Sequence, residues 1–158
     1  MRSVQVRGAV GFGINAKNSV ISDCVVEDVS PAPANSATAG VLTESGKVTG
    51  SLVRNISGNG SVTRGIGAGV VHDCTVEGVQ ATAGHASGIN ALITDNGTAV
   101  ISGAAENCRV RNVFATGSAS GIYYFGATAV VPSAPSLPPT ASVARPESLD
   151  RMSVSHKS

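Results

Sequence analysis

The sequence contains no tryptophan, and aromatic residues make up only 3% of its 158 positions. A core without large rings has to be assembled from small β-branched side chains in many thin layers, which favours a stacked repeat over a compact globule. Charged residues are scarce too, at 13%, and the net charge is +1. This near-neutral chain has no excess of positive charge that would attract nucleic acid or an anionic membrane surface, so we predict no nucleic-acid partner.

Long apolar runs are also missing. No run approaches the roughly 18 apolar residues that a membrane-spanning helix requires, so we predict no membrane insertion. The opening residues, Met1–Arg7, include no apolar segment of the kind that forms the centre of a secretory signal peptide. We therefore expect a soluble chain with no signal peptide of its own.

The chain is organised around one short phrase that occurs four times. Its clearest copy runs from Asp73 through Cys74 to Val79, behind a Gly65-Ile66 pair. The other copies surround Cys24, Ser51 and Cys108 and follow Gly13-Ile14, Gly40-Val41 and Gly88-Ile89. A fifth opening, Gly121-Ile122, begins a repeat that is not completed.

The apolar positions of each repeat predict short strands joined by tight corners. Their spacing is two within short segments and three between segments, which is typical of strands with one buried face. The residues expected to face the core include Ile14, Val26, Val53, Val76, Ile89 and Val110. The position four after the cysteine is Asp28, Asn55, Gly78 or Asn112. These types tolerate a positive φ or bond their own backbone, so we expect a corner there.

Repeats differ in length because two of them carry insertions. One insertion, Ser30–Ala39, is rich in proline and alanine, and the other, Leu92–Ala104, contains Asp95-Asn96-Gly97, which predicts a hairpin turn. A solenoid accepts such loops at its corners, since each coil need only stay in register with its neighbours. Runs of good helix formers are absent, which excludes an α-solenoid.

Three segments are expected along the chain. Residues 1–12 resemble the remnant of a preceding coil, residues 13–125 form the repeat domain, and residues 126–158 form a disordered tail rich in proline, serine and alanine. The tail is either a flexible linker or the point at which a natural stack of coils once continued.

The Gly-Ile opening and the Val-x-x-Cys-x-Val-x-x-Val phrase, at intervals of roughly two dozen residues, resemble the repeats of pectate-lyase-like proteins. The resemblance covers Gly13 to about Phe125. It implies an all-β fold, a right-handed parallel β-helix solenoid of about four coils with three short parallel sheets. It also implies a location outside the cell or at the cell surface, with any active groove on the outer face of one sheet and the loops beside it.

Equivalent positions in a stack of coils form columns, because neighbouring strands lie ~4.8 Å apart. The column of Cys24, Ser51, Cys74 and Cys108 is expected to hold inward, structural thiols. Cys24 and Cys74 are a whole coil apart, and parallel stacking seldom meets the dihedral that a Cys74–Cys108 disulfide would need. The column of Glu27, Arg54, Glu77 and Arg111 alternates in charge and predicts an exposed ladder of ion pairs.

Catalytic groups are hard to find in these columns. The outward positions that follow the glycines are Asn15, Leu42, Gly67, Asn90 and Tyr123. They include no pair of carboxylates for glycoside hydrolysis and no aspartate cluster for calcium beside a base, so we predict no metal and no cofactor. His72 and Asp73 are the only catalytic candidates, and the matching residues in other coils favour a role as corner residues.

The expected function is therefore a non-catalytic β-helix module of a secreted or cell-surface protein. It would serve as a scaffold, an adhesive surface or a weak glycan-binding surface, with Tyr123, Tyr124 and Phe125 as the glycan contacts and a polysaccharide as partner. Two alternatives remain open. One is a fragment of a polysaccharide lyase or glycoside hydrolase whose catalytic coils lie outside this chain, and the other is a phage or fibre solenoid. Unpaired strand edges at the ends of the stack predict self-association.

Overall fold

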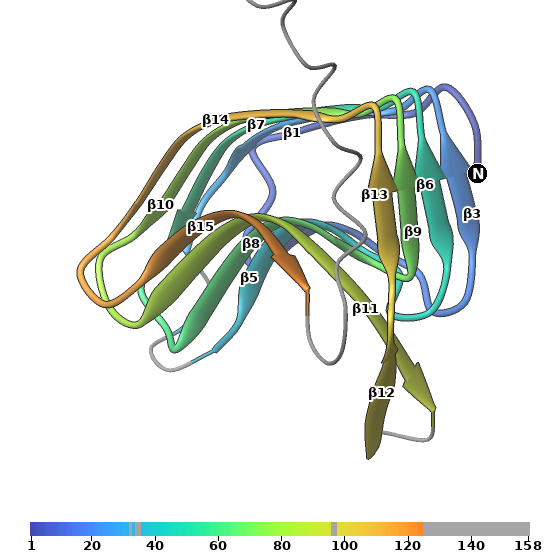
Figure 1. Ribbon diagram of the computed structural model, residues 1–158. Coiled ribbons are helices and arrows are strands. Elements are labelled where there is room, and N and C mark those ends of the chain that lie inside the picture. Colours follow the sequence, from blue (N-terminus) through green and yellow to red (C-terminus); the bar gives the residue numbers. More distant parts are fainter. Residues whose placement is uncertain (32, 34–35, 96–97, 125–158) are drawn as a thin grey trace, which may run out of the picture.

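The structure is a computed structural model that describes residues 1–31, 33, 36–95 and 98–124. The described residues form fifteen strands and no helix, and hence no helix that could cross a membrane. Phe125 and the tail expected at 126–158 lie outside the described residues. Each coil passes through three sheets in turn, which we call the first, second and third sheets (Figure 1).

The first sheet holds the strands of the Gly-Ile openings. It consists of β2 (Phe12–Asn15), β5 (Thr38–Leu42), β8 (Val62–Ala68), β11 (His85–Asp95) and β15 (Ala119–Tyr124), with β12 (Thr98–Ser102) beside β11. The second sheet consists of β3 (Val20–Ser22), β6 (Lys47–Thr49), β9 (Val70–His72) and β13 (Ala104–Glu106). The third sheet consists of β1 (Gln5–Arg7), β4 (Val25–Val29), β7 (Leu52–Gly58), β10 (Thr75–Ala81) and β14 (Arg109–Ala115).

Neighbouring strands pair in parallel, which confirms the parallel β-helix of about four coils. The exception is β12, which pairs antiparallel with β11 and projects with the end of that strand beyond the stack (Figure 1). This pairing joins Asp95 to Thr98 and confirms the predicted hairpin, although Asn96 and Gly97 themselves lie outside the described residues. The segment before the first repeat also contributes, since β1 pairs with β4 and adds one strand to the third sheet.

The core consists of aliphatic columns, as the spacing predicts. Ile14, Val26, Val53, Val76 and Ile89 are all buried, and each such side chain contributes roughly 1.5–3 kcal/mol of transfer free energy. Val110 is only half-buried because β14 is the edge strand of its sheet. The third-sheet valines stack in register, with Val76 paired to both Val53 and Val110.

The glycine that opens each repeat is required by close packing between the first and third sheets. A Cβ on Gly65 would lie 2.4 Å from Cγ1 of Val76 and 2.5 Å from the carbonyl oxygen of Gly88. Gly13, Gly40 and Gly88 face the equivalent valine of their own coil at similar distances. The Gly-Ile signature is therefore a steric requirement of the core, because no side chain fits between the valine column and the next coil.

Corners are formed where the sequence predicts them. Asp28, Asn55, Gly78 and Asn112 have φ values of 56°, 57°, 70° and 57°. The residue before each cysteine position makes a second such column, which the sequence analysis did not predict. Its members are Asp23, Gly50, Asp73 and Asn107, with φ values of 56°, 57°, 53° and 51°. Amide side chains join neighbouring rungs, as where Nδ2 of Asn55 donates to Oδ1 of Asp28 over 2.9 Å.

The charged column forms ion pairs but is not uniformly exposed. Arg54 pairs with Glu27, and Nη2 of Arg111 lies 2.8 Å from Oε2 of Glu77, as the alternation predicts. The expected exposure is wrong for Glu27, whose side chain is only 7% exposed. The arginine of the neighbouring rung covers this carboxylate, so the pair is partly removed from solvent.

Candidate functional site

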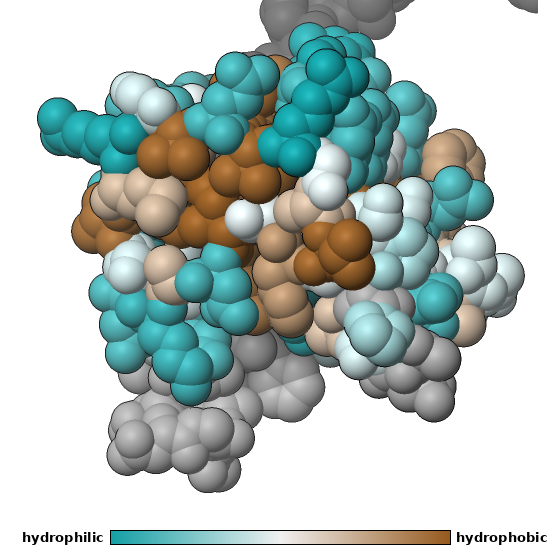
Figure 2. Space-filling model, turned by 180° about the vertical axis from the view of Figure 1, so that it is seen from behind, coloured by the Kyte–Doolittle hydropathy of each residue, from teal (hydrophilic) through white to brown (hydrophobic). Residues whose placement is uncertain are grey.

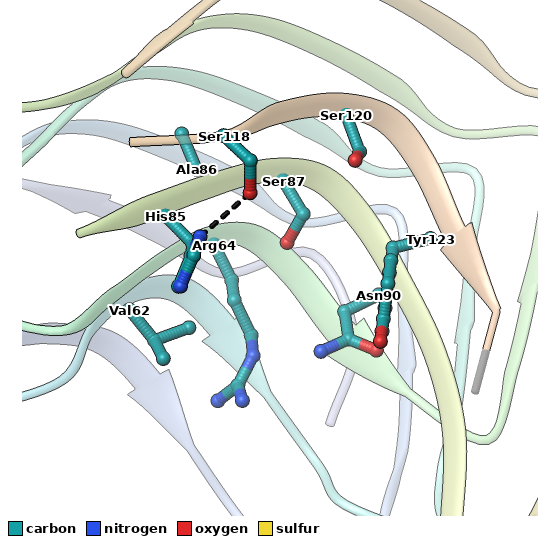
Figure 3. Close-up of a pocket in the computed structure, with 9 residues that line it drawn as sticks. All are labelled: Val62, Arg64, His85, Ala86, Ser87, Asn90, Ser118, Ser120 and Tyr123. Atoms are coloured by element: carbon teal, nitrogen blue, oxygen red, sulfur yellow. Dashed lines mark hydrogen bonds between the residues drawn. The ribbon is translucent and has the colours of Figure 1, made fainter. Parts of the chain in front are cut away.

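A pocket of about 260 Å³ lies on the outer face of the first sheet (Figure 3). We call it the Arg64 pocket. It is lined by Val62, Arg64, His85, Ala86, Ser87, Asn90, Ser118, Ser120 and Tyr123. These residues come from β8, β11 and β15 and from the turn before β15, so the pocket exists only where three successive coils stack.

Two columns of the first sheet position its polar groups. In the column that directly precedes the glycines, Arg64 pairs with Ser87, which in turn pairs with Ser120. The pocket forms because the next two residues of this column after the arginine are small. In the column that follows the Gly-Ile pairs, Asn90 lies between Gly67 and Tyr123.

The Arg64 side chain is a half-buried cation without a counter-ion. It forms no ion pair within the part of the chain that the structure describes, and its Nε, which is shielded from solvent, has no hydrogen-bond partner. Burial lowers the pKa of the guanidinium, because desolvation disfavours the charged form. An arginine remains charged in spite of such a shift, so the pocket presents a partly desolvated positive charge.

Asn90, a second lining residue of the pocket, carries a buried acceptor without a partner among the described residues. Its side chain was expected to face solvent, but the residue is only 7% exposed. Its Oδ1 is buried without a hydrogen-bond partner, whereas most buried polar atoms have one. Figure 3 shows the Arg64 side chain extending between Val62 and His85 on one side and Asn90 and Tyr123 on the other. The pocket thus places a cation and an amide side chain next to each other.

His85 closes the end of the pocket nearest the turn before β15. Its Nδ1 lies 2.6 Å from Oγ of Ser118, which fixes the ring between two neighbouring coils (Figure 3). The lining residues that the structure describes include no carboxylate. With one cation, several hydroxyl and amide groups and a tyrosine, the arrangement is suited to binding and lacks the two carboxylates of a hydrolase.

Of the expected glycan contacts, Tyr123 lies in this pocket and is 43% exposed. Tyr124 ends β15, and its side chain, like the whole of Phe125, lies outside what the structure describes. Sequence reasoning missed Arg64 because it followed the positions after the glycine. The residues directly before the glycines are Phe12, Ala39, Arg64, Ser87 and Ser120. A single charge among neutral residues in that column was the available signal.

The catalytic candidates lie elsewhere, at the corner after β9. His72 Nδ1 is 2.6 Å from Oδ2 of Asp73, and His72 Nε2 is 3.8 Å from Oε2 of Glu106 on the neighbouring coil. Asp73 also accepts a hydrogen bond from the amide of Asn107. All three ionisable side chains are well exposed. The structure thus adds Glu106 to the predicted pair, and the described residues include no cluster of histidine, cysteine and carboxylate side chains that could hold a metal.

The cysteine column is inward and contains no disulfide. Cys24 and Cys74 are buried, Cys108 is half-buried, and all three are free thiols. Each Sγ donates to the carbonyl oxygen two residues earlier, and the hydroxyl of Ser51 does the same. The two neighbouring thiols shift each other's pKa: the Cys74 S–H can turn to the Cys108 sulfur when that sulfur ionises, which together with burial raises the pKa of Cys74. The same interaction lowers the pKa of Cys108.

Comparisons with family models, curated proteins and solved structures give no match for this chain. Its function is therefore argued from the pocket and the fold.

Proposed function

We propose that this chain is a non-catalytic β-helix module of a secreted or cell-surface protein of the pectate-lyase-like type, and that it binds a glycan in the Arg64 pocket. One observation carries the proposal. A half-exposed tyrosine, Tyr123, stands one rung from Asn90 in a hollow lined otherwise by small and polar residues. An aromatic face beside convergent hydroxyl and amide groups suits a sugar ring, which has both an apolar face and a rim of hydroxyls.

The size and position of the pocket support a binding role. At about 260 Å³ it lies just below the usual range of roughly 300–1,000 Å³ for small-molecule sites, which suits one sugar unit of a longer chain. The pocket opens on the outer face of a sheet, so the rest of a polysaccharide can continue along the stack. A single-unit contact of this kind predicts weak binding.

Replacing the aromatic group tests the proposal. We expect Tyr123→Ala to abolish binding of the intact chain to immobilised plant and bacterial polysaccharides in affinity electrophoresis. The matched control is Phe114→Ala, which removes an exposed ring from β14 on the third sheet. If both variants bind like the parent, or if the parent binds no polysaccharide, the glycan proposal is wrong.

The second candidate is a fragment of a polysaccharide lyase or hydrolase, and the contact of His72 with Asp73 favours it. We expect no turnover, because the groups around His72 are solvent-exposed and neither Asp73 nor Glu106 lines the Arg64 pocket. Incubation of the purified chain with pectate and alginate, followed by detection of unsaturated or reducing ends, decides between the two. Turnover that disappears in Asp73→Asn would establish the enzyme.

A further inference from the structure

The two unpaired groups of the Arg64 pocket define a ligand more closely than its shape does. The guanidinium of half-buried Arg64 favours an anionic acceptor, since partial removal of a charge from water is costly unless the charge is paired and hydrogen-bonded. Oδ1 of Asn90 needs a donor, because a buried acceptor without a partner loses the hydrogen bond it had in water. A water molecule can satisfy Asn90, but only an anion neutralises Arg64.

We propose that the Arg64 pocket is a binding site for an oxyanion carried on a hydroxylated molecule, with Arg64 pairing the oxyanion and the Asn90 amide hydrogen-bonding to an adjacent hydroxyl. This inference rests on the proposed function only for the choice of pocket. A carboxylate, a sulfate ester and a phosphate ester share the required chemistry, and an acidic sugar combines any of them with hydroxyls.

The fold holds Arg64 in place for this role. Its ladder neighbours, Ala39 on β5 and Ser87 on β11, are small and leave room for its stem. Gly67 lies beside Arg64 Cδ, so the side chain passes over bare backbone. The two terminal nitrogens of the guanidinium can form the two parallel hydrogen bonds by which arginine binds an oxyanion.

The other positively charged side chains near the sheets are not available to bind an oxyanion in this pocket. Arg54 and Arg111 on the third sheet are already paired with Glu27 and Glu77. His85 faces the pocket, but its Nδ1 is engaged with Ser118. Within the described chain, Arg64 is the guanidinium that lines this pocket and lacks a carboxylate.

The test compares charged and neutral sugars on the intact chain. Chemical-shift titrations use glucose, glucuronate, glucose 6-sulfate and glucose 6-phosphate, with sodium sulfate as a bare anion. We expect at least one charged sugar to bind about tenfold more tightly than glucose, because a charge-assisted hydrogen bond exceeds a neutral one by about that factor. The three charged sugars identify which oxyanion the pocket prefers, and added sodium chloride should reduce the preference.

Substitutions of Arg64 test whether this residue causes the preference for charged sugars. Arg64→Gln should remove the preference for charged sugars, and Arg64→Lys should keep part of it because charge remains while the planar fork is lost. Arg109→Gln is the matched control, since it removes one positive charge from the exposed edge of β14. We also expect Arg64→Gln to fold and to melt no lower than the parent, because it removes an unpaired, half-buried charge.

The outcomes separate this inference from the proposed function. Equal binding of glucose and all charged sugars, or an unchanged preference in Arg64→Gln, overturns the oxyanion site while the glycan proposal stands. Binding of sulfate that Arg64→Gln abolishes, without binding of any sugar, supports the oxyanion part and overturns both the hydroxyl contact and the glycan proposal. Absence of binding by every probe overturns both.

Discussion

Arg64 lies across Gly67, and a Cβ placed on Gly67 would lie 3.3 Å from Cδ of Arg64 and 2.8 Å from Cδ1 of Leu42. The backbone at this position accepts a side chain in other coils, where Leu42 and Asn90 occupy the same column. We therefore expect Gly67→Val to fold and to displace Arg64 into solvent. Preference for charged over neutral sugars should fall about tenfold, as measured by the same titrations. An unchanged preference would show that Arg64 can bind the charged group without passing over Gly67.

The glycine column yields a prediction about stability. Gly65→Ala places a methyl group 2.4 Å from Cγ1 of Val76 and 2.5 Å from a carbonyl oxygen, so the coils must separate locally. We expect a loss of about 1–3 kcal/mol in the free energy of unfolding, measured with urea. Gly121→Ala is the matched control, because its new methyl group would meet nothing closer than 4.0 Å. Similar losses in both variants would contradict the packing argument.

Placing a carboxylate at a core position tests which valines face the interior of the stack. Val76 is fully buried in a central coil, whereas Val20 on β3 is 60% exposed. We expect Val76→Asp to unfold the chain, because an isolated carboxylate cannot be buried, and Val20→Asp to melt like the parent. Circular dichroism gives both results, and the parent spectrum should be dominated by β-structure. Folding of Val76→Asp would show that the valine column is not the core.

The pair of thiols makes a prediction about pH. Because the Cys74 side chain can donate its S–H to the Cys108 sulfur and so lowers the pKa of Cys108, the Cys108 thiolate should form at a lower pH than an ordinary thiolate. Iodoacetamide should therefore alkylate Cys108 at neutral pH, while buried Cys24 and Cys74 react only after unfolding. Mass spectrometry reports the sites. Cys74→Ala should move the profile of Cys108 to higher pH, and an unchanged profile would exclude the hydrogen bond as its cause.

We propose that the chain self-associates through the ends of the described stack. Apolar surface gathers on the face opposite to the view of Figure 1, as Figure 2 shows. Val10, in the segment before the first repeat, is 68% exposed. The rungs at the two edges of the charged column are Arg7 and Arg111, so end-to-end contact in register brings like charges together. We expect weak association that strengthens with salt.

Sedimentation velocity across a concentration series measures this association. Val10→Glu should abolish it by placing a charge on the apolar end, whereas Gln80→Glu, on an exposed position of a central strand, should not. A monomer at every salt and protein concentration would contradict the proposal.

The sequence by itself determined the fold, because a parallel solenoid is encoded by local periodicity. A spacing of two fixes which side chains turn inward, and a glycine fixes where two sheets approach too closely for a Cβ, as at Gly65. Residues that tolerate positive φ fix the corners, as at Asn55. All of these are properties of a short stretch of chain, so the repeated phrase was sufficient to predict the fold.

The candidate site was decided by tertiary structure, because it depends on which rungs become neighbours. Arg64 becomes a pocket residue only where small Ser87 lies beside it in the next coil and leaves an empty space. Glu27 becomes buried only because Arg54 covers it, and His72 meets Glu106 only across a long insertion. These contacts join residues more than twenty positions apart, and their burial depends on the size of the neighbouring side chains.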